Sequence, residues 1–171
     1  ATAKEKISEA LQEINNELKT ISGYLPQVGK QQKLEFIHEL ANVQDQLANY
    51  LTKAETELNN YSTTRKRLIS FADKEDIFFI PRLITNTLYD TRTIVSVLKK
   101  CQEEVFVHPN ETSELVAEEI ISLHVFFKGY VKTLEKMLHV YENLYESVYA
   151  CDTKEREKRL DIQYRSYIAN K

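Results

Sequence analysis

Glu35 and His38 come nearest to a metal-binding motif in this sequence. They are three positions apart, which is the spacing of the Glu-x-x-His pairs that bind di-iron and di-manganese centres inside helical bundles. Those centres need two such pairs on inward-facing sides of helices. The sequence has only one pair, and it flanks the expected core residue Ile37. We therefore interpret Glu35 and His38 as solvated surface residues and predict no metal site.

A second candidate chemistry is phosphotransfer at His124, because a phosphotransfer bundle presents a histidine with a lysine and a glycine shortly after it. Histidine can act as a nucleophile, and Lys128 and Gly129 follow His124 here. The lysine follows by four positions rather than the usual three, and Phe127 stands where a small residue would admit a partner. We interpret His124 as a residue at the rim of an apolar face.

The remaining histidines and the two cysteines, Cys101 and Cys151, are isolated in the sequence. Structural zinc sites use ligand pairs two to four residues apart, and no such pair occurs. Motifs for a nucleophile or a phosphate-binding loop are also missing. The sequence therefore predicts no catalytic residue, no cofactor and no enzymatic activity.

Tyrosines recur at helical spacing in the second half of the chain and form a candidate partner surface. Tyrosine is enriched at interfaces because it joins an apolar ring to a polar hydroxyl. An equally weighted alternative is a core layer whose hydroxyls lie at its edge. The candidate partner surface comprises Tyr130, Leu138, Tyr141, Tyr145 and Tyr149.

Four consecutive large apolar residues form a candidate end patch, comprising Ile77, Phe78, Phe79 and Ile80. Such a cluster at a chain reversal suits docking to a protein partner or to a membrane surface. A hydrophobic plug that caps one end of the fold is the preferred interpretation.

The composition indicates an all-α protein. Only three Gly and three Pro occur in 171 residues, whereas a sheet protein of this size needs many turns. The net charge of −3, with acidic and basic residues interspersed, argues against the basic face of a nucleic-acid-binding protein. The longest apolar runs fall far short of the ~20 residues that cross a bilayer. Few cysteines and no recognisable signal peptide favour a cytoplasmic location, with a fragment of a membrane-anchored or secreted protein as the alternative.

Apolar residues recur at alternating spacings of four and three, as in helices that pack lengthwise on one another. The cluster of Gly23, Pro26 and Gly29 predicts the first reversal, and further reversals are expected at about 73–80 and 107–110. The predicted helices span about 3–22, 31–72, 81–106 and 112–168. The expected core positions of the third helix are Ile84, Leu88, Val95, Leu98 and Val105.

The fourth predicted helix, 112–168, has an apolar arc much wider than one stripe. Its eleven core positions from Val116 to Cys151 carry no charge, so this helix either lies centrally against two or three others or faces a second molecule in part. Gly129 in its middle costs about 1 kcal/mol relative to alanine. We attribute this glycine to the close approach of a neighbouring helix.

These observations predict a single domain, 1–171, folded as an elongated antiparallel four-helix up-down bundle with long coiled-coil-like helices. The expected function is a non-enzymatic module for protein–protein interaction or scaffolding, with either another protein or a second copy of the chain as partner. A homodimer is one form of that prediction. The alternative is a ligand-sensing four-helix domain of a membrane receptor. No nucleic-acid partner is expected.

Overall fold

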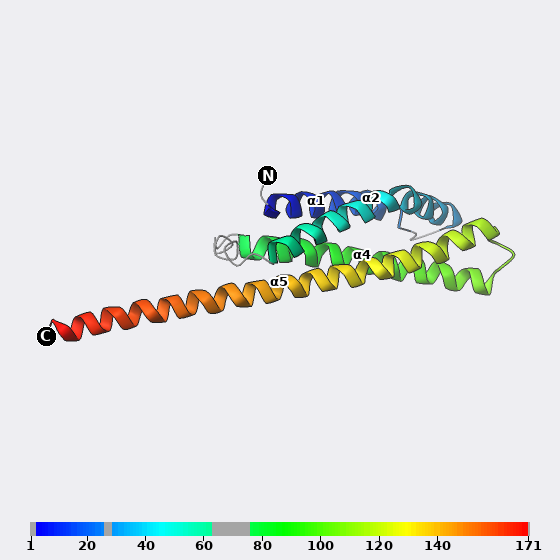
Figure 1. Cartoon of the computed structure of the whole chain (residues 1–171). Helices are drawn as coiled ribbons and strands as arrows, with labels where there is room; N and C mark the ends of the chain where they lie inside the picture. The colour runs from blue at the N-terminus through cyan, green and yellow to red at the C-terminus, as the bar shows by residue number, and fades with distance from the viewer. Residues whose placement is uncertain (1–2, 26–28, 63–75, 171) are drawn as a thin grey trace.

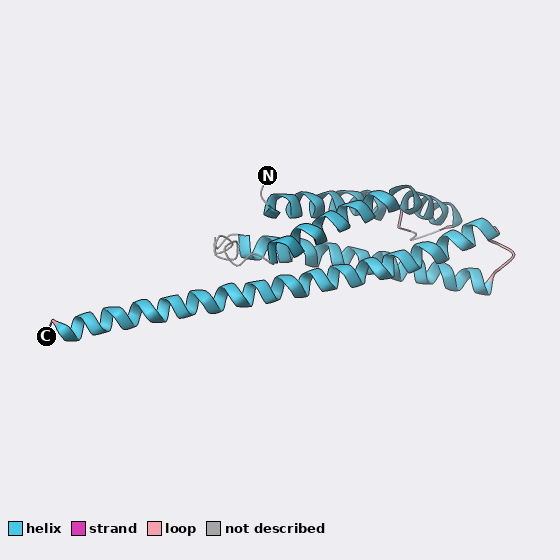
Figure 2. Cartoon of the chain, in the orientation of Figure 1, coloured by secondary structure: helices cyan, strands magenta, loops and turns pink. Residues whose placement is uncertain are grey.

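The computed structural model describes residues 3–25, 29–62 and 76–170. Side chains are described for 5–25, 29, 31–60, 80–143, 161–162 and 164–170. The described part of the chain consists of long helices and short connections (Figures 1 and 2). The helices are α1 (Ala3–Ser22), α2 (Lys30–Ser62), α4 (Asp76–Val107) and α5 (Glu114–Ala169). The prediction of an all-α bundle is confirmed, and none of the described helices has an apolar stretch long enough to cross a membrane.

Local sequence features explain the buried side of α1, the turn before α2 and the start of α5. The apolar residues that recur at 4-3-4-3 spacing in α1 are each at most 1% exposed, because this spacing places all of them on one side of the helix: Ile7, Leu11, Ile14, Leu18 and Ile21. Gly29, which precedes α2, has a φ of 90°, a conformation that glycine adopts readily. Ser113 caps α5 by accepting a hydrogen bond from the Val116 N–H at 3.3 Å.

The helices alternate in direction along the chain and form two antiparallel hairpins, α1–α2 and α4–α5 (Figure 1). The hairpins stack so that α2 contacts α5 and α1 contacts α4. Tyr130 bonds to Leu47, and nearer the C-termini of both helices Lys136 pairs with Glu55. Helices α2 and α5 therefore run parallel. Each helix has two main neighbours, so α5 is no more central than the others.

The core stripe of α4 runs through two threonines, which corrects the sequence prediction. Val95 and Val105 are only partly buried, whereas Thr87 and Thr91 have no exposed surface. A stripe of buried side chains follows a regular 4-3-4-3 spacing: Ile80, Ile84, Thr87, Thr91, Ile94, Leu98 and Cys101. The predicted core residue Leu88 is buried beside this stripe. Each hydroxyl donates to a carbonyl of its own helix, Thr87 to Leu83 at 2.8 Å and Thr91 to Thr87 at 2.7 Å. This back-bonding removes the penalty for burying a threonine hydroxyl.

Replacing each threonine with valine is expected to distinguish the contributions of the two hydroxyls to stability. Thr87 Oγ1 also lies 3.0 Å from Asn15 Oδ1 of α1, so Thr87→Val removes a contact between hairpins and is expected to lower the free energy of unfolding by about 1 kcal/mol. Thr91→Val removes only a bond within α4 and is expected to be neutral or slightly stabilising. Urea unfolding followed by circular dichroism measures both, and equal losses would argue against a distinct role for Thr87.

The boundaries of α4 differ from the predicted reversal at about 73–80. The helix begins at Asp76, so 77–80 are helical and Pro81 lies inside the helix rather than in its first turn. The predicted continuation of α2 over 63–72 lies outside the described residues. The described bounds of α5, Glu114–Ala169, agree with prediction within two residues.

The prediction that a neighbouring helix approaches Gly129 is wrong. A Cβ placed on this glycine meets no described atom within 4 Å outside its own turn of the helix, and the residue is exposed. It lies on the side of α5 that faces away from the bundle. Packing within the chain therefore does not explain a glycine in the middle of this helix.

Helix α5 projects well beyond the other helices (Figure 1). Its 56 residues correspond to a rod of about 84 Å. We call residues 161–170 the C-terminal arm. Every side chain described in the arm is exposed, so the arm contributes little to the core of its own chain.

Candidate functional site

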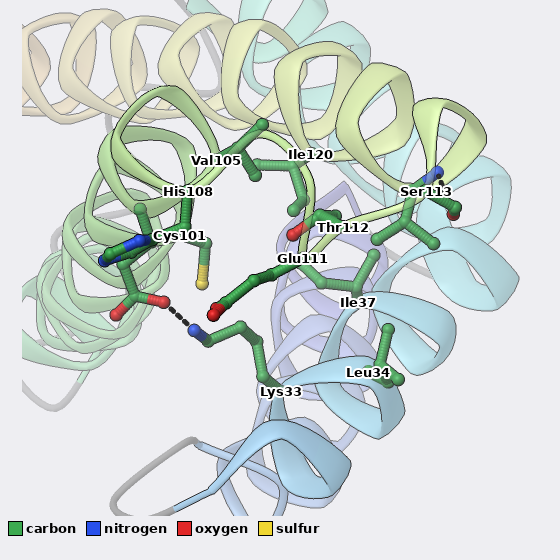
Figure 3. A pocket seen from close by; sticks show the side chains of 12 residues that line it. Lys33, Leu34, Ile37, Cys101, Val105, His108, Glu111, Thr112, Ser113 and Ile120 are labelled. Carbon is green, nitrogen blue, oxygen red and sulfur yellow. Dashed lines mark hydrogen bonds and ion pairs between the residues drawn. The ribbon is translucent and has the colours of Figure 1, made fainter.

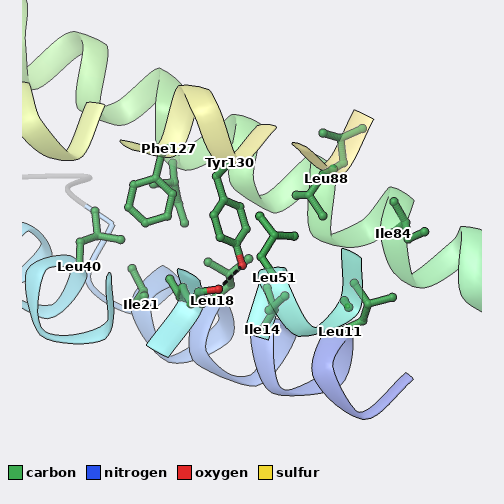
Figure 4. Close-up of a cluster of buried hydrophobic side chains, with 14 of the residues drawn as sticks. Leu11, Ile14, Leu18, Ile21, Leu40, Leu51, Ile84, Leu88, Phe127 and Tyr130 are labelled. Atoms are coloured by element: carbon green, nitrogen blue, oxygen red, sulfur yellow. Dashed lines mark hydrogen bonds between the residues drawn. The ribbon is translucent and has the colours of Figure 1, made fainter. Parts of the chain in front are cut away.

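Tyr130 belongs to the core and not to an exposed partner surface. It is 3% exposed, and its ring points from α5 toward the α1–α2 hairpin (Figure 4). The hydroxyl donates to the Leu47 carbonyl at 3.0 Å, which satisfies a group that would be costly to bury alone. Burial raises the pKa of the Tyr130 phenol well above its ordinary value, so this side chain stays neutral.

The other four residues of the candidate partner surface differ in where they lie and in whether their side chains are described. Tyr141 is also 3% exposed and lies in the core, while Leu138 is partly buried against it. The side chains of Tyr145 and Tyr149 lie outside the described ones. For Tyr130 and Tyr141 the structure matches the core-layer alternative, because both occupy the 4-3 core stripe of α5.

The candidate end patch is placed only at its last residue. Ile80 has no exposed surface and begins the buried stripe of α4, so it is a core residue and not part of a docking patch. The side chains of Ile77, Phe78 and Phe79 are outside the described part.

A cavity of about 320 Å³ lies where the α4–α5 connection meets the beginning of α2. Its walls are largely apolar, with Ile37, Val105 and Ile120 among them, and its rim carries an ion pair between Lys33 and Glu104 (Figure 3). Sequence reasoning missed this cavity because its lining comes from three separate helices and one loop. Its volume and mixed lining suit a small molecule with an apolar body and a charged group.

Cys101 faces the same cavity but is a poor nucleophile. The residue is 2% exposed, and burial raises the pKa of its thiol, although the positive charge of Lys33 opposes part of that rise. A buried thiol that stays protonated reacts slowly. The arrangement therefore favours a packing role for Cys101.

The histidines considered for chemistry remain apart from one another. Glu35 and His38 line a shallow hollow between α2 and α5, and the described residues hold no group of three or more His, Cys, Asp or Glu side chains placed to bind a metal ion. Partial burial lowers the pKa of His124, and the charges of Lys128 and Lys99 lower it further. His124 is therefore predominantly neutral at pH 7, with cations nearby.

A polar groove runs along the contact between α1 and α4. It is lined by Asn15, Lys19, Thr85, Asn86, Tyr89 and Asp90. Partial burial raises the pKa of Asp90, and the positive charge of Lys19 opposes that rise. This groove holds few groups that converge on one point, so it suggests no specific ligand.

Comparison with known proteins finds no match. No protein-family model, no curated protein and no solved structure is significantly similar to this chain. The geometry of the described residues is therefore the basis for a functional proposal.

Proposed function

We propose that this chain is a non-enzymatic helical-bundle module for protein–protein interaction or scaffolding. The observation that carries the proposal is the C-terminal arm, which holds large apolar side chains in solvent. Tyr164, Tyr167 and Ile168 are 64%, 61% and 53% exposed. Apolar clusters of this kind on a folded protein mark interaction sites.

The three side chains lie on one face of the arm, because residues three and four positions apart are neighbours on a helix. An ion pair between Asp161 and Arg165 at 3.3 Å occupies an adjoining face. An amphipathic helix with anchors at this spacing typically docks into an apolar groove of a partner. Tyrosine is also among the residues that contribute most to binding energy at such interfaces.

A photo-crosslinking amino acid at position 164 is expected to give a discrete adduct with a partner in cells that produce the chain. The double substitution Tyr167→Glu and Ile168→Glu is expected to abolish that adduct, because charge opposes burial of this face in a groove. Helix content is expected to persist because both side chains are exposed. Mass spectrometry of the adduct identifies the partner.

The matched control places the same crosslinker at Ile162, which is 60% exposed but lies on the opposite side of the helix from Tyr164. A specific docking face gives an adduct from position 164 and little from position 162. Equal yields from both positions, or an adduct that survives the double substitution, would count against the proposal.

A second candidate function, a ligand-sensing domain of a membrane receptor, is favoured by the cavity at the α4–α5 connection. Val116 lines this cavity and is partly buried. Compounds with an apolar body and a charged group are expected to raise the melting temperature of the natural chain but not of Val116→Trp, in which the cavity is filled. Equal effects on both proteins would remove this candidate.

A further inference from the structure

The outward side of α5 has a charge and size pattern that is complementary to itself. Its centre is Val125, which is 66% exposed. Positions four, seven and eleven residues before and after this valine lie within about 40° of it around a helix that turns 100° per residue. These positions define the outer face: Glu114, Glu118, Ile121, Val125, Gly129, Lys132 and Lys136.

The outer face is acidic before its centre, apolar at its centre and basic after it. All seven residues are exposed, so this face of α5 lies outside the core of the bundle. A second copy laid antiparallel with a two-fold axis at Val125 brings Glu118 opposite Lys132 and Glu114 opposite Lys136. Every attractive pair then occurs twice, as two-fold symmetry requires.

The same superposition gives Gly129 a role that the single chain does not. In the antiparallel pair, Ile121 of one copy lies over Gly129 of the other, where the missing side chain leaves space for the isoleucine. Outside its own turn of the helix, no described atom of the chain lies within 4 Å of a Cβ built at this position. Small residues at a helix crossing let the two backbones come close together.

Interactions within the chain account for only part of this charge pattern. Glu114 lies in the first turn of α5, where a negative charge complements the helix dipole, but Glu118 lies beyond that turn. Lys136 pairs with Glu55 at 3.8 Å while its side chain stays 71% exposed. Lys132 and Lys136 are also far from the C-terminus of α5, so the helix dipole does not explain them.

We propose that two copies of this chain associate antiparallel through the outer face of α5, with the two-fold axis at Val125. The contact spans about 33 Å of a single helix from each copy, and an interface of this size gives weak, reversible association. The proposal extends the role of an interaction module, but it uses none of the residues of the C-terminal arm. Either surface can therefore fail without the other.

Sedimentation equilibrium of the full chain tests the charge pairing. The natural chain is expected to dimerise in the micromolar range at low ionic strength and to dissociate as salt screens the pairs. Glu118→Lys and Lys132→Glu each turn two attractive pairs into repulsive ones, so each is expected to weaken the dimer roughly tenfold or more. The double variant Glu118→Lys/Lys132→Glu restores both pairs and is expected to recover most of the affinity.

Disulfide formation tests the geometry in a Cys151→Ser background, in which the remaining natural cysteine, Cys101, is buried. Val125→Cys is expected to form a disulfide-linked dimer rapidly, because a residue on the axis meets its own copy. Ile121→Cys is the control, since its two copies are about 12 Å apart along an antiparallel pair, beyond the reach of a disulfide. A parallel dimer would crosslink at both positions.

The outcomes distinguish dimerisation through the outer face of α5 from self-association through the C-terminal arm. A chain that stays monomeric at all concentrations, or a double charge variant no better than the single ones, overturns it. A dimer that survives Val125→Glu but is lost in Tyr164→Glu also overturns it and assigns self-association to the C-terminal arm. Loss of the dimer in Val125→Glu, with helix content unchanged, supports the outer face.

Discussion

Truncating Phe127 to alanine is expected to lower the free energy of unfolding by about 3–5 kcal/mol. The ring has no exposed surface, and it points from α5 toward the α1–α2 hairpin (Figure 4). The centroid of the ring lies 5.0 Å from that of Phe126, in an edge-to-face arrangement, and 6.0 Å from that of Tyr130. Alanine loses the packing contacts that the buried ring makes. It leaves a cavity that the closely packed helices cannot fill.

Val125→Ala is the matched control for Phe127→Ala. It removes an apolar side chain only two positions away on the same helix, but one that is 66% exposed, so a change below about 0.5 kcal/mol is expected. Urea unfolding at a protein concentration below that of dimerisation measures both variants. A loss of less than about 1 kcal/mol at Phe127 would mean that the two hairpins do not pack as described.

An aspartate in place of Ile14 is expected to cost on the order of 4 kcal/mol or more and to release α1 from the bundle. Ile14 has no exposed surface and lies midway along the core stripe of α1. A helix of 20 residues has little stability of its own in water. Its order therefore depends on the packing of this stripe against α2 and α4.

Limited proteolysis measures the release of α1 directly. In Ile14→Asp, cleavage within Ala3–Ser22 is expected to precede cleavage elsewhere, whereas Glu13→Ala, a change at the exposed neighbour, leaves the pattern of the natural chain. Unchanged protection of α1 in the aspartate variant would show that its order does not come from this core stripe.

The sequence was sufficient to predict the core of α1 but not that of α4. In α1 the stripe from Ile7 to Ile21 holds only large aliphatic residues, so spacing alone identifies the buried side. In α4 the stripe passes through Thr87 and Thr91, which a hydrophobic pattern counts as polar. Their hydroxyls bond to carbonyls of their own helix, and only the folded helix reveals that these groups are satisfied.

The apolar spacing of the sequence also does not predict how the helices are arranged or which sides of α5 are exposed. Heptad spacing identifies which side of a helix is buried, but not which helices meet, so the parallel contact of α2 with α5 had no signal in the sequence. The cost of a glycine in mid-helix predicts a close neighbour at Gly129, but the sequence does not show which side of α5 this residue occupies. Tyr130 and Tyr141 followed the core stripe, and their hydroxyls did not distinguish a buried position from an interface.

The stacking of two hairpins has a consequence for the order in which the chain folds. The bond between Thr87 and Asn15 joins residues 72 positions apart, and that between Tyr130 and Leu47 joins residues 83 apart, whereas α4 and α5 are joined by a short connection. Contacts between distant positions form late because closing a long loop costs more entropy. Each hairpin is therefore expected to form first, and the encounter of the two preformed halves limits the folding rate. Because both halves belong to one chain, their meeting is intramolecular, and covalent linkage sets the effective concentration of one half for the other.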